Sequence, residues 1–123
     1  MKLIANESTI FFDVDDTLVM WGIKAKRGQK LVAITSPYDG SQVYLAPHAG
    51  HIKVLKDRYK RGSFIIVWSA GGFKWAEAVV KALKLQDYVN VCMTKPHMYV
   101  DDKPAKEVLG TRLYLPYTDK YGT

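Results

Sequence analysis

The stretch that decides the fold is "FFDVDDTLV", residues 11–19. It places three carboxylates, those of Asp13, Asp15 and Asp16, directly after apolar residues that are typical of a buried strand. Clustered carboxylates are costly, because each one raises the free energy of ionising its neighbours unless a cation or hydrogen-bond donors compensate. An Asp-rich turn is the simple alternative, since Asp readily begins turns. The stretch therefore indicates either a turn or a cation site at the end of a strand.

The composition is that of one globular domain over residues 1–123, with 48% hydrophobic residues and enough length to bury a core without disulfides. The apolar runs are too short to span a bilayer, and the N-terminus lacks the apolar region of a signal peptide, so we expect no membrane association. Cys92, the only cysteine, lies among apolar neighbours and is expected to be a buried, inert thiol. A cytoplasmic location follows as the simplest expectation, whereas the oligomeric state is left open.

The chain is basic, with a formal net charge of +6, and a basic surface favours partners that carry phosphate, including nucleic acid. Much of this charge falls within residues 24–30 and 53–61. We expect the second cluster to be the solvated face of a helix. For the first cluster a partner surface and a solvated face are equally good interpretations.

The hydrophobic pattern predicts alternating strands and helices. Helices are expected over residues 48–61 and 73–84, where apolar residues recur at helical spacing. Two β-rich runs within 31–46, with Asp39-Gly40 at the reversal, predict a hairpin. Further extended segments are expected over residues 9–14, 64–68, 88–93, 97–100 and 111–116. This order predicts an open, mostly parallel α/β sheet with helices on both faces, a three-layer α/β/α fold.

Polar or acidic residues follow directly after three of the apolar runs, in "FFDVDD", "FIIVWS" and "YVDD". In open α/β sheets, reactive groups gather at the carboxyl ends of the strands. We therefore expect these three strand ends to converge on one site.

On these residues the chain resembles the haloacid dehalogenase (HAD) superfamily of phosphohydrolases. The family's first motif, Asp-x-Asp-x-Thr after a hydrophobic strand, is matched by Asp13 to Thr17. Its second motif, a strand ending in Ser or Thr, is matched by Ser69, and its fourth, a strand ending in paired acids, by Asp101 and Asp102. The motifs stand in the family's order, and the resemblance covers most of residues 9–116. It implies a HAD-like Rossmannoid fold.

The chain leaves little room for the large cap domain that members of this family often carry. Only residues 20–47 remain for one, which suffices for a β-hairpin flap in place of a cap domain. Short, nearly capless phosphatases of this type resemble those often encoded by bacteriophages. The site is therefore expected to be open.

The resemblance assigns catalytic roles to the first motif. Asp13 would be the nucleophile that forms an aspartyl-phosphate, which splits one difficult displacement into two easier ones. Asp15 would be the general acid and then the base, and its backbone carbonyl would touch the metal. Asp16 is expected to cap the turn. Thr17, at the edge of the substrate site, is expected to stabilise the loop by bonding a backbone group.

The remaining motifs would bind metal and phosphate. Mg²⁺ would be held by Asp13, Asp15 and the acidic pair, in which Asp102 is favoured over Asp101 as the direct ligand, since hard oxygen ligands suit this ion. Ser69 and the backbone N–H groups around Ala70 and Gly71 would bind the phosphoryl oxygens at a helix N-terminus.

The third motif, a lysine, is where the chain departs from the family. Lys95, in "MTKP", is the natural candidate, but it precedes Asp101 by only six residues. A parallel crossover needs about a dozen residues, so the usual helix between the third and fourth strands cannot fit. Lys103 and Lys74 are the alternatives.

The sequence therefore predicts a Mg²⁺-dependent phosphomonoesterase. An open, basic site favours a phosphate on something larger, such as a nucleic-acid end or a phosphoprotein, and the resemblance to bacteriophage phosphatases makes nucleotide or polynucleotide phosphates reasonable substrates. Some aromatic side chains, otherwise core or edge packing, would offer stacking surfaces: Trp21, Tyr38, Tyr44 and Trp75. The alternative is a HAD scaffold without activity that serves as a nucleic-acid-binding or interaction module.

Two other uses of clustered acids fit less well. A phospho-signalling receiver domain places its acidic pair on the first strand and its acceptor Asp on a middle one, whereas here the middle strand ends in Ser69. A calcium-binding EF-hand loop beginning at Asp13 would need Gly at its sixth position and Glu at its twelfth, which are Leu18 and Lys24. The three histidines show no metal-ligand pattern and are assigned no role: His48, His51 and His97.

Overall fold

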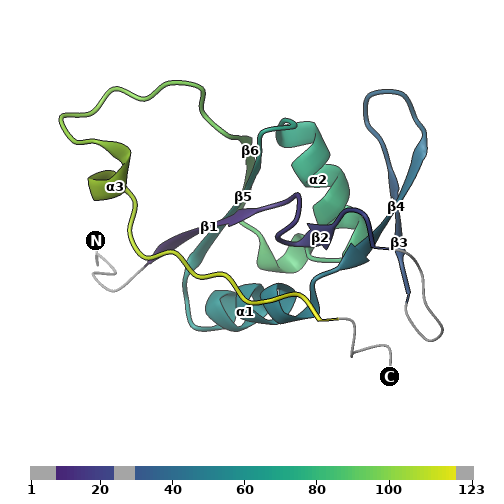
Figure 1. The fold of residues 1–123 in the computed structure, drawn as a ribbon. Coiled ribbons are helices and arrows are strands. Elements are labelled where there is room, and N and C mark those ends of the chain that lie inside the picture. The colour runs from purple at the N-terminus through teal and green to yellow at the C-terminus, as the bar shows by residue number, and fades with distance from the viewer. Residues whose placement is uncertain (1–7, 24–29, 119–123) are drawn as a thin grey trace.

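The computed structural model describes residues 8–23 and 30–118 (Figure 1). Its strands are β1 (Thr9–Asp13), β2 (Val19–Met20), β3 (Val32–Thr35), β4 (Gln42–Pro47), β5 (Phe64–Ser69) and β6 (Val91–Thr94). Its helices are α1 (Ala49–Lys60), α2 (Phe73–Ala82), α3 (Ala105–Val108) and the short 3₁₀ helix η1 (Gln86–Tyr88). The predicted α/β class is confirmed, and the long helices and principal strands lie where the hydrophobic pattern places them.

A parallel sheet of three strands, in the order β1-β5-β6, forms the centre of the molecule. Its register pairs Asp13 with Trp68 and Ser69 with Thr94, so the three strands end at the same edge. The first and second predicted strand ends therefore converge, as expected of parallel strands.

Both long helices cover the same face of this sheet. On that face the alternate residues Phe12 of β1 and Val67 of β5 share one buried cluster with Leu55 of α1 and with Val79 of α2. This arrangement follows from two successive crossovers that progress in one direction across the sheet, β1-α1-β5 and β5-α2-β6.

The opposite face is more open, which corrects the predicted three-layer fold. There Phe11, which is 38% exposed, stacks on Trp68 with ring centroids 4.1 Å apart. In the described part of the chain, the only helix after β6 is α3, and all four of its residues are exposed. A covering layer would require a helix packed on this face, and the described chain after β6 offers only the exposed α3.

Two predicted strands are wrong. Neither residues 97–100 nor residues 111–116 form a strand. The chain leaves β6 in a wide exposed loop, and the segment beyond α3 runs along α1 instead of joining the sheet (Figure 1).

The predicted hairpin is confirmed. Strands β3 and β4 pair antiparallel, and β2 joins the other side of β4. At the reversal, Asp39 accepts hydrogen bonds from the N–H and hydroxyl of Ser41, and Gly40 adopts φ +76°. Gly at this left-handed position is what a tight reversal requires.

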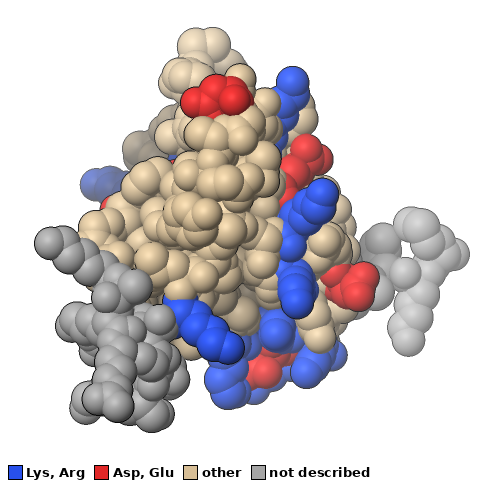
Figure 2. Space-filling view, turned by 90° about the vertical axis from the view of Figure 1, so that its right-hand side faces the viewer, with Lys and Arg blue, Asp and Glu red and all other residues tan. Residues whose placement is uncertain are grey.

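The charges lie at the surface. In α1 the basic residues Lys53, Arg58 and Lys60 are exposed, and Lys53 pairs with Asp57 at 2.7 Å, so the predicted solvated helix face is confirmed. Figure 2 shows Lys and Arg side chains gathered along one side of the molecule with acidic groups among them. Of the first basic cluster, residues 24–29 lie outside the described residues.

Two further expectations concern the thiol and the membrane. Cys92 is half-buried rather than buried, and desolvation, followed by the charge of Glu77, raises the pKa of its thiol to about 11. The thiol is therefore protonated near neutral pH, as expected of an inert cysteine.

Among the described residues, no helix combines the length and the apolar character that a bilayer crossing demands.

Candidate active site

The acidic loop after β1 is a tight turn closed by the backbone. The carbonyl of Val14 accepts hydrogen bonds from the N–H groups of Thr17, Leu18 and Val19 at 2.9–3.2 Å. Asp16 adopts φ +59°, a left-handed conformation that Asp tolerates, and its carboxylate accepts the N–H of Trp21 at 3.0 Å. The predicted capping role of Asp16 is thus confirmed. Val14 is fully buried whereas Asp13 and Asp15 are half-buried beside it.

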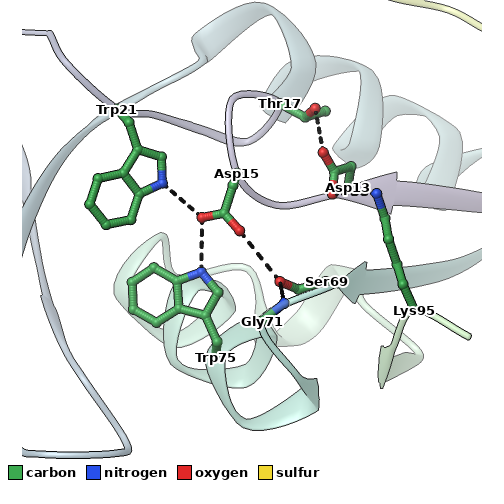
Figure 3. A network of polar contacts seen from close by, with 8 residues as sticks. All are labelled: Asp13, Asp15, Thr17, Trp21, Ser69, Gly71, Trp75 and Lys95. Atoms are coloured by element: carbon green, nitrogen blue, oxygen red, sulfur yellow. Dashed lines mark hydrogen bonds and ion pairs between the residues drawn. The ribbon is translucent and has the colours of Figure 1, made fainter. Parts of the chain in front are cut away.

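Asp13 lies between a cation and a hydroxyl. Its Oδ1 is 3.0 Å from Lys95 Nζ, and its Oδ2 accepts the Thr17 hydroxyl at 3.1 Å (Figure 3). The Thr17 hydroxyl therefore bonds the neighbouring carboxylate and not a backbone group as predicted. Both side chains of the ion pair are about one-third exposed, so a ligand from solvent can approach them.

Lys95 reaches Asp13 because the hydrogen bonds between β5 and β6 continue for one residue beyond the end of β6. The Lys95 N–H donates to the carbonyl of Ser69 at 2.9 Å, which holds the lysine at the carboxyl edge of the sheet. Of the three lysines considered from the sequence, Lys95 is the one with an ion pair to Asp13, whereas Lys103 and Lys74 are exposed. No crossover helix is needed, since the lysine directly follows its strand.

Asp15 is held by two tryptophans. Its Oδ1 accepts the indole N–H of Trp21 at 2.8 Å and that of Trp75 at 3.0 Å, while its Oδ2 is 3.4 Å from the Ser69 hydroxyl (Figure 3). Sequence reasoning considered these tryptophans only as stacking or packing surfaces and missed their N–H groups. The available signal was their position, shortly after the first motif and at the start of the helix after the second.

The loop from Ser69 to Gly72 turns into α2. Ser69 is fully buried, and its hydroxyl oxygen accepts the Gly71 N–H at 2.9 Å. The next two N–H groups donate within the protein as well, Gly72 to the Ser69 carbonyl and Phe73 to the Thr94 hydroxyl. The Gly71 N–H predicted to bind phosphate is therefore engaged inside the loop. Ala70 is exposed at the tip of this loop.

The β3–β4 hairpin folds over this loop. The hydroxyl of Tyr38 donates to the carbonyl of Gly71, and Gly72 has φ +104°. A Cβ atom on Gly72 would lie 2.6 Å from that hydroxyl oxygen. Glycine is thus needed both for the backbone conformation and for the close approach of the hairpin.

The acidic pair does not join the site. Asp101 and Asp102 lie on the exposed loop before α3, where Asp101 accepts the N–H of Lys103 at 3.0 Å. Over residues 8–23 and 30–118, no group of three or more Asp, Glu, His or Cys side chains is arranged to hold a metal ion. Asp13, Asp15 and Asp102 form no such group among the described residues, where residues 97–100 form no strand that would carry the pair to the sheet edge, and their role as metal ligands stays a prediction.

Two histidines support the acidic loop from α1, and sequence reasoning assigned them no role. His51 Nδ1 lies 2.7 Å from the Thr17 carbonyl, and His51 Nε2 accepts the Leu115 N–H at 2.8 Å. The His48 ring stacks on His51 at 3.7 Å and contacts the Leu115 carbonyl at 3.0 Å. Burial lowers the pKa of His51 below its ordinary value of 6.5. The segment after α3 is thereby fastened to the loop that carries Asp13 and Asp15.

Comparison of the chain with family models, curated proteins and solved structures finds no match. The functional interpretation therefore rests on the geometry of the site. At one edge of a parallel sheet it brings together an ion-paired carboxylate, Asp13, and a carboxyl group with a fixed orientation, Asp15, beside the buried hydroxyl of Ser69.

Proposed function

We propose that the protein is a HAD-like, Mg²⁺-dependent phosphomonoester hydrolase that works through an aspartyl-phosphate on Asp13. The observation that supports it most is the 3.0 Å contact between Asp13 and Lys95 at the end of β1. A carboxylate nucleophile must approach an anionic phosphate, and a neighbouring cation offsets the repulsion between them.

The reaction would proceed in two displacements. In the first, an Asp13 carboxylate oxygen attacks phosphorus, the bond from phosphorus to the ester oxygen breaks, and Asp15 gives its proton to the departing oxygen. In the second, a water oxygen attacks phosphorus while Asp15 takes the proton of that water. The bond between phosphorus and Asp13 then breaks, which releases phosphate and restores both carboxyl groups. Lys95 would offset negative charge in both displacements.

The end of β1 offers part of a magnesium site. The Asp13 carboxylate and the Asp15 backbone carbonyl are hard oxygen donors on one short loop, and Mg²⁺ in phosphoryl-transfer sites needs only one or two carboxylates because it retains several waters. These two residues would hold the ion. Mg²⁺ bound there supplies positive charge that lets the phosphate and the nucleophile meet.

The substrate class that fits best is a nucleotide or a phosphorylated nucleic-acid end. The net charge of +6 favours a polyanionic partner. Trp21 is 47% exposed directly beside Asp15, so a face next to the reacting groups is available for stacking on a base.

The test is Mg²⁺-dependent release of phosphate from an aryl phosphate by the wild type and by Asp13→Asn. The matched control is Asp87→Asn, which makes the same chemical change at an exposed residue of η1. We expect turnover by the wild type and Asp87→Asn, none by Asp13→Asn, and a phosphoryl adduct on the wild type in intact-protein mass spectrometry after a rapid acid quench. Equal rates for Asp13→Asn and wild type would overturn the proposal, as would binding of oligonucleotides without turnover of any phosphate.

Once turnover is found, a substrate panel separates the classes. Nucleoside monophosphates, oligonucleotides with a 3′- or 5′-phosphate, and phosphosugars should be compared at low salt. A preference for phosphosugars would contradict the proposed substrate class while leaving the hydrolase proposal in place.

A further inference from the structure

Both indole N–H groups near the site donate to the same oxygen of Asp15. Trp21 Nε1 lies 2.8 Å and Trp75 Nε1 3.0 Å from Oδ1. Oδ2 faces the other way, toward Ser69, at a distance of 3.4 Å that is long for a hydrogen bond (Figure 3). The two oxygens of one carboxyl group are therefore in different environments.

This asymmetry suits a carboxyl group that must alternate between acid and base. A protonated carboxyl group carries its proton on one oxygen and still accepts hydrogen bonds at the other. With both indole N–H donors on Oδ1, the proton can come and go at Oδ2 without loss of either indole bond, because the Ser69 hydroxyl beside Oδ2 can donate to the ionised form or accept from the protonated one. An indole N–H on each oxygen, which donates but cannot accept, would instead favour only the ionised form.

The geometry points to Trp21 and Trp75 as positioning residues that fix Asp15 through Oδ1 and make Oδ2 the atom that transfers the proton. This inference rests on the proposed function, since it concerns proton transfer to a leaving oxygen. It goes beyond the HAD resemblance, because the motifs that carry the resemblance include neither tryptophan.

The two tryptophans come from separate elements and are held differently. Trp75 is 7% exposed, lies in the first turn of α2 and belongs to the core cluster, whereas Trp21 is 47% exposed and directly follows β2. Their rings lie 6.3 Å apart at an angle of 34°. Asp15 is thus held by a rigid donor from the core and a second donor from the surface.

The test removes the N–H groups while keeping aromatic rings, with Trp21→Phe as the principal variant because its ring is largely outside the core. Trp75→Phe is the second variant, used if urea denaturation shows that it folds. Tyr59→Phe, on an exposed part of α1, is the control that removes a polar group from an aromatic ring elsewhere. Each variant is assayed on two substrates. One is an aryl phosphate with a good leaving group, and the other is an alkyl phosphate whose leaving oxygen needs a proton as it departs.

We expect Trp21→Phe to lower kcat for the alkyl phosphate by about 10- to 100-fold, since loss of a positioned proton donor has this order of effect. The kcat for the aryl phosphate should fall by less than about 3-fold, because its leaving group departs without protonation. Tyr59→Phe should match the wild type on both substrates.

The outcomes separate this inference from the proposed function. Equal losses on the two substrates, or no loss, in a folded Trp21→Phe would overturn the inference while the hydrolase stands. A wild type without activity on either phosphate would overturn the proposed function itself, and with it the proton-transfer role of Asp15.

Discussion

Acidification is expected to loosen the segment of residues 111–118 from α1, with His51 as the group that responds. The hydrogen bonds define its protonation state. Leu115 N–H donates to Nε2, so this nitrogen carries no proton, and Nδ1 must carry the one that is donated to the Thr17 carbonyl. His51 is therefore neutral in the folded protein. A second proton would have to sit on Nε2, directly opposite the Leu115 N–H.

The lowered pKa of His51 decides the direction in which pH changes the stability of the protein. Burial is the main cause that lowers the pKa of His51 below 6.5, and the neighbouring His48 acts in the same direction. His51 is 2% exposed, and its ring faces the His48 and Tyr114 rings. Because the unfolded chain then binds a proton more readily, stability is full above about pH 6.5 and is lost as the pH falls toward the folded pKa. One proton changes the free energy of unfolding by at most about 1.4 kcal/mol per pH unit.

The assay is urea denaturation between about pH 5 and pH 8, a range in which histidine changes its charge. The His51→Gln variant should be less stable at neutral pH by about 1–3 kcal/mol, because Thr17 and Leu115 lose their partner. Its stability should also fall less steeply below pH 6.5 than that of the wild type. His97→Gln, at an exposed position, is the matched control and should keep the wild-type slope. Identical slopes for His51→Gln and the wild type would refute the reasoning.

Two further predictions concern the site. Lys95→Gln should lower kcat on an aryl phosphate by about 100-fold or more, because it removes the cation beside Asp13, whereas Lys103→Gln on the exposed loop should retain the wild-type rate. A steady-state assay decides this, and equal rates for the two variants would contradict a catalytic role for Lys95. Gly72→Ala should lower the free energy of unfolding, measured by urea denaturation, by about 1–3 kcal/mol. Alanine is strained at the φ of +104°, and its Cβ would also clash with the Tyr38 hydroxyl. In a Tyr38→Phe background the cost should be smaller, and an unchanged cost would show that the clash contributes nothing.

The sequence predicted those features that local pattern determines. Apolar periodicity placed β1, β5, α1 and α2, and parallel pairing then brought Asp13 and Ser69 to one edge. The sequence also named Lys95 as the first candidate for the third motif, and the structure shows it beside Asp13, because the residue that follows a parallel strand stays at the carboxyl end of the sheet.

The features that it missed depend on tertiary contacts. The apolar run before Asp101 resembles a strand, yet a strand needs a neighbour within reach, and only five residues lie between Lys95 and Asp101. The Trp21 and Trp75 indoles contact Asp15 only in the tertiary fold, because Trp21 follows β2 and Trp75 lies in α2. The apolar pattern of a sequence indicates that a tryptophan can be buried, but it does not indicate which group its N–H contacts.

The acidic loop is held from three directions, which links the stability prediction to catalysis. Trp75 fixes Asp15 from α2, His51 bonds the Thr17 carbonyl from α1, and the Tyr114 hydroxyl donates to the Asp16 carbonyl at 2.9 Å. The last two contacts involve or adjoin the segment that acidification should loosen. If preorganisation of this loop sets the rate, Tyr114→Phe should lower kcat although Tyr114 touches neither Asp13 nor Asp15 in the described contacts. The loss should then grow as the pH falls below 6.5, because a proton on His51 Nε2 opposes the hydrogen bond from the Leu115 N–H and loosens the segment that carries Tyr114.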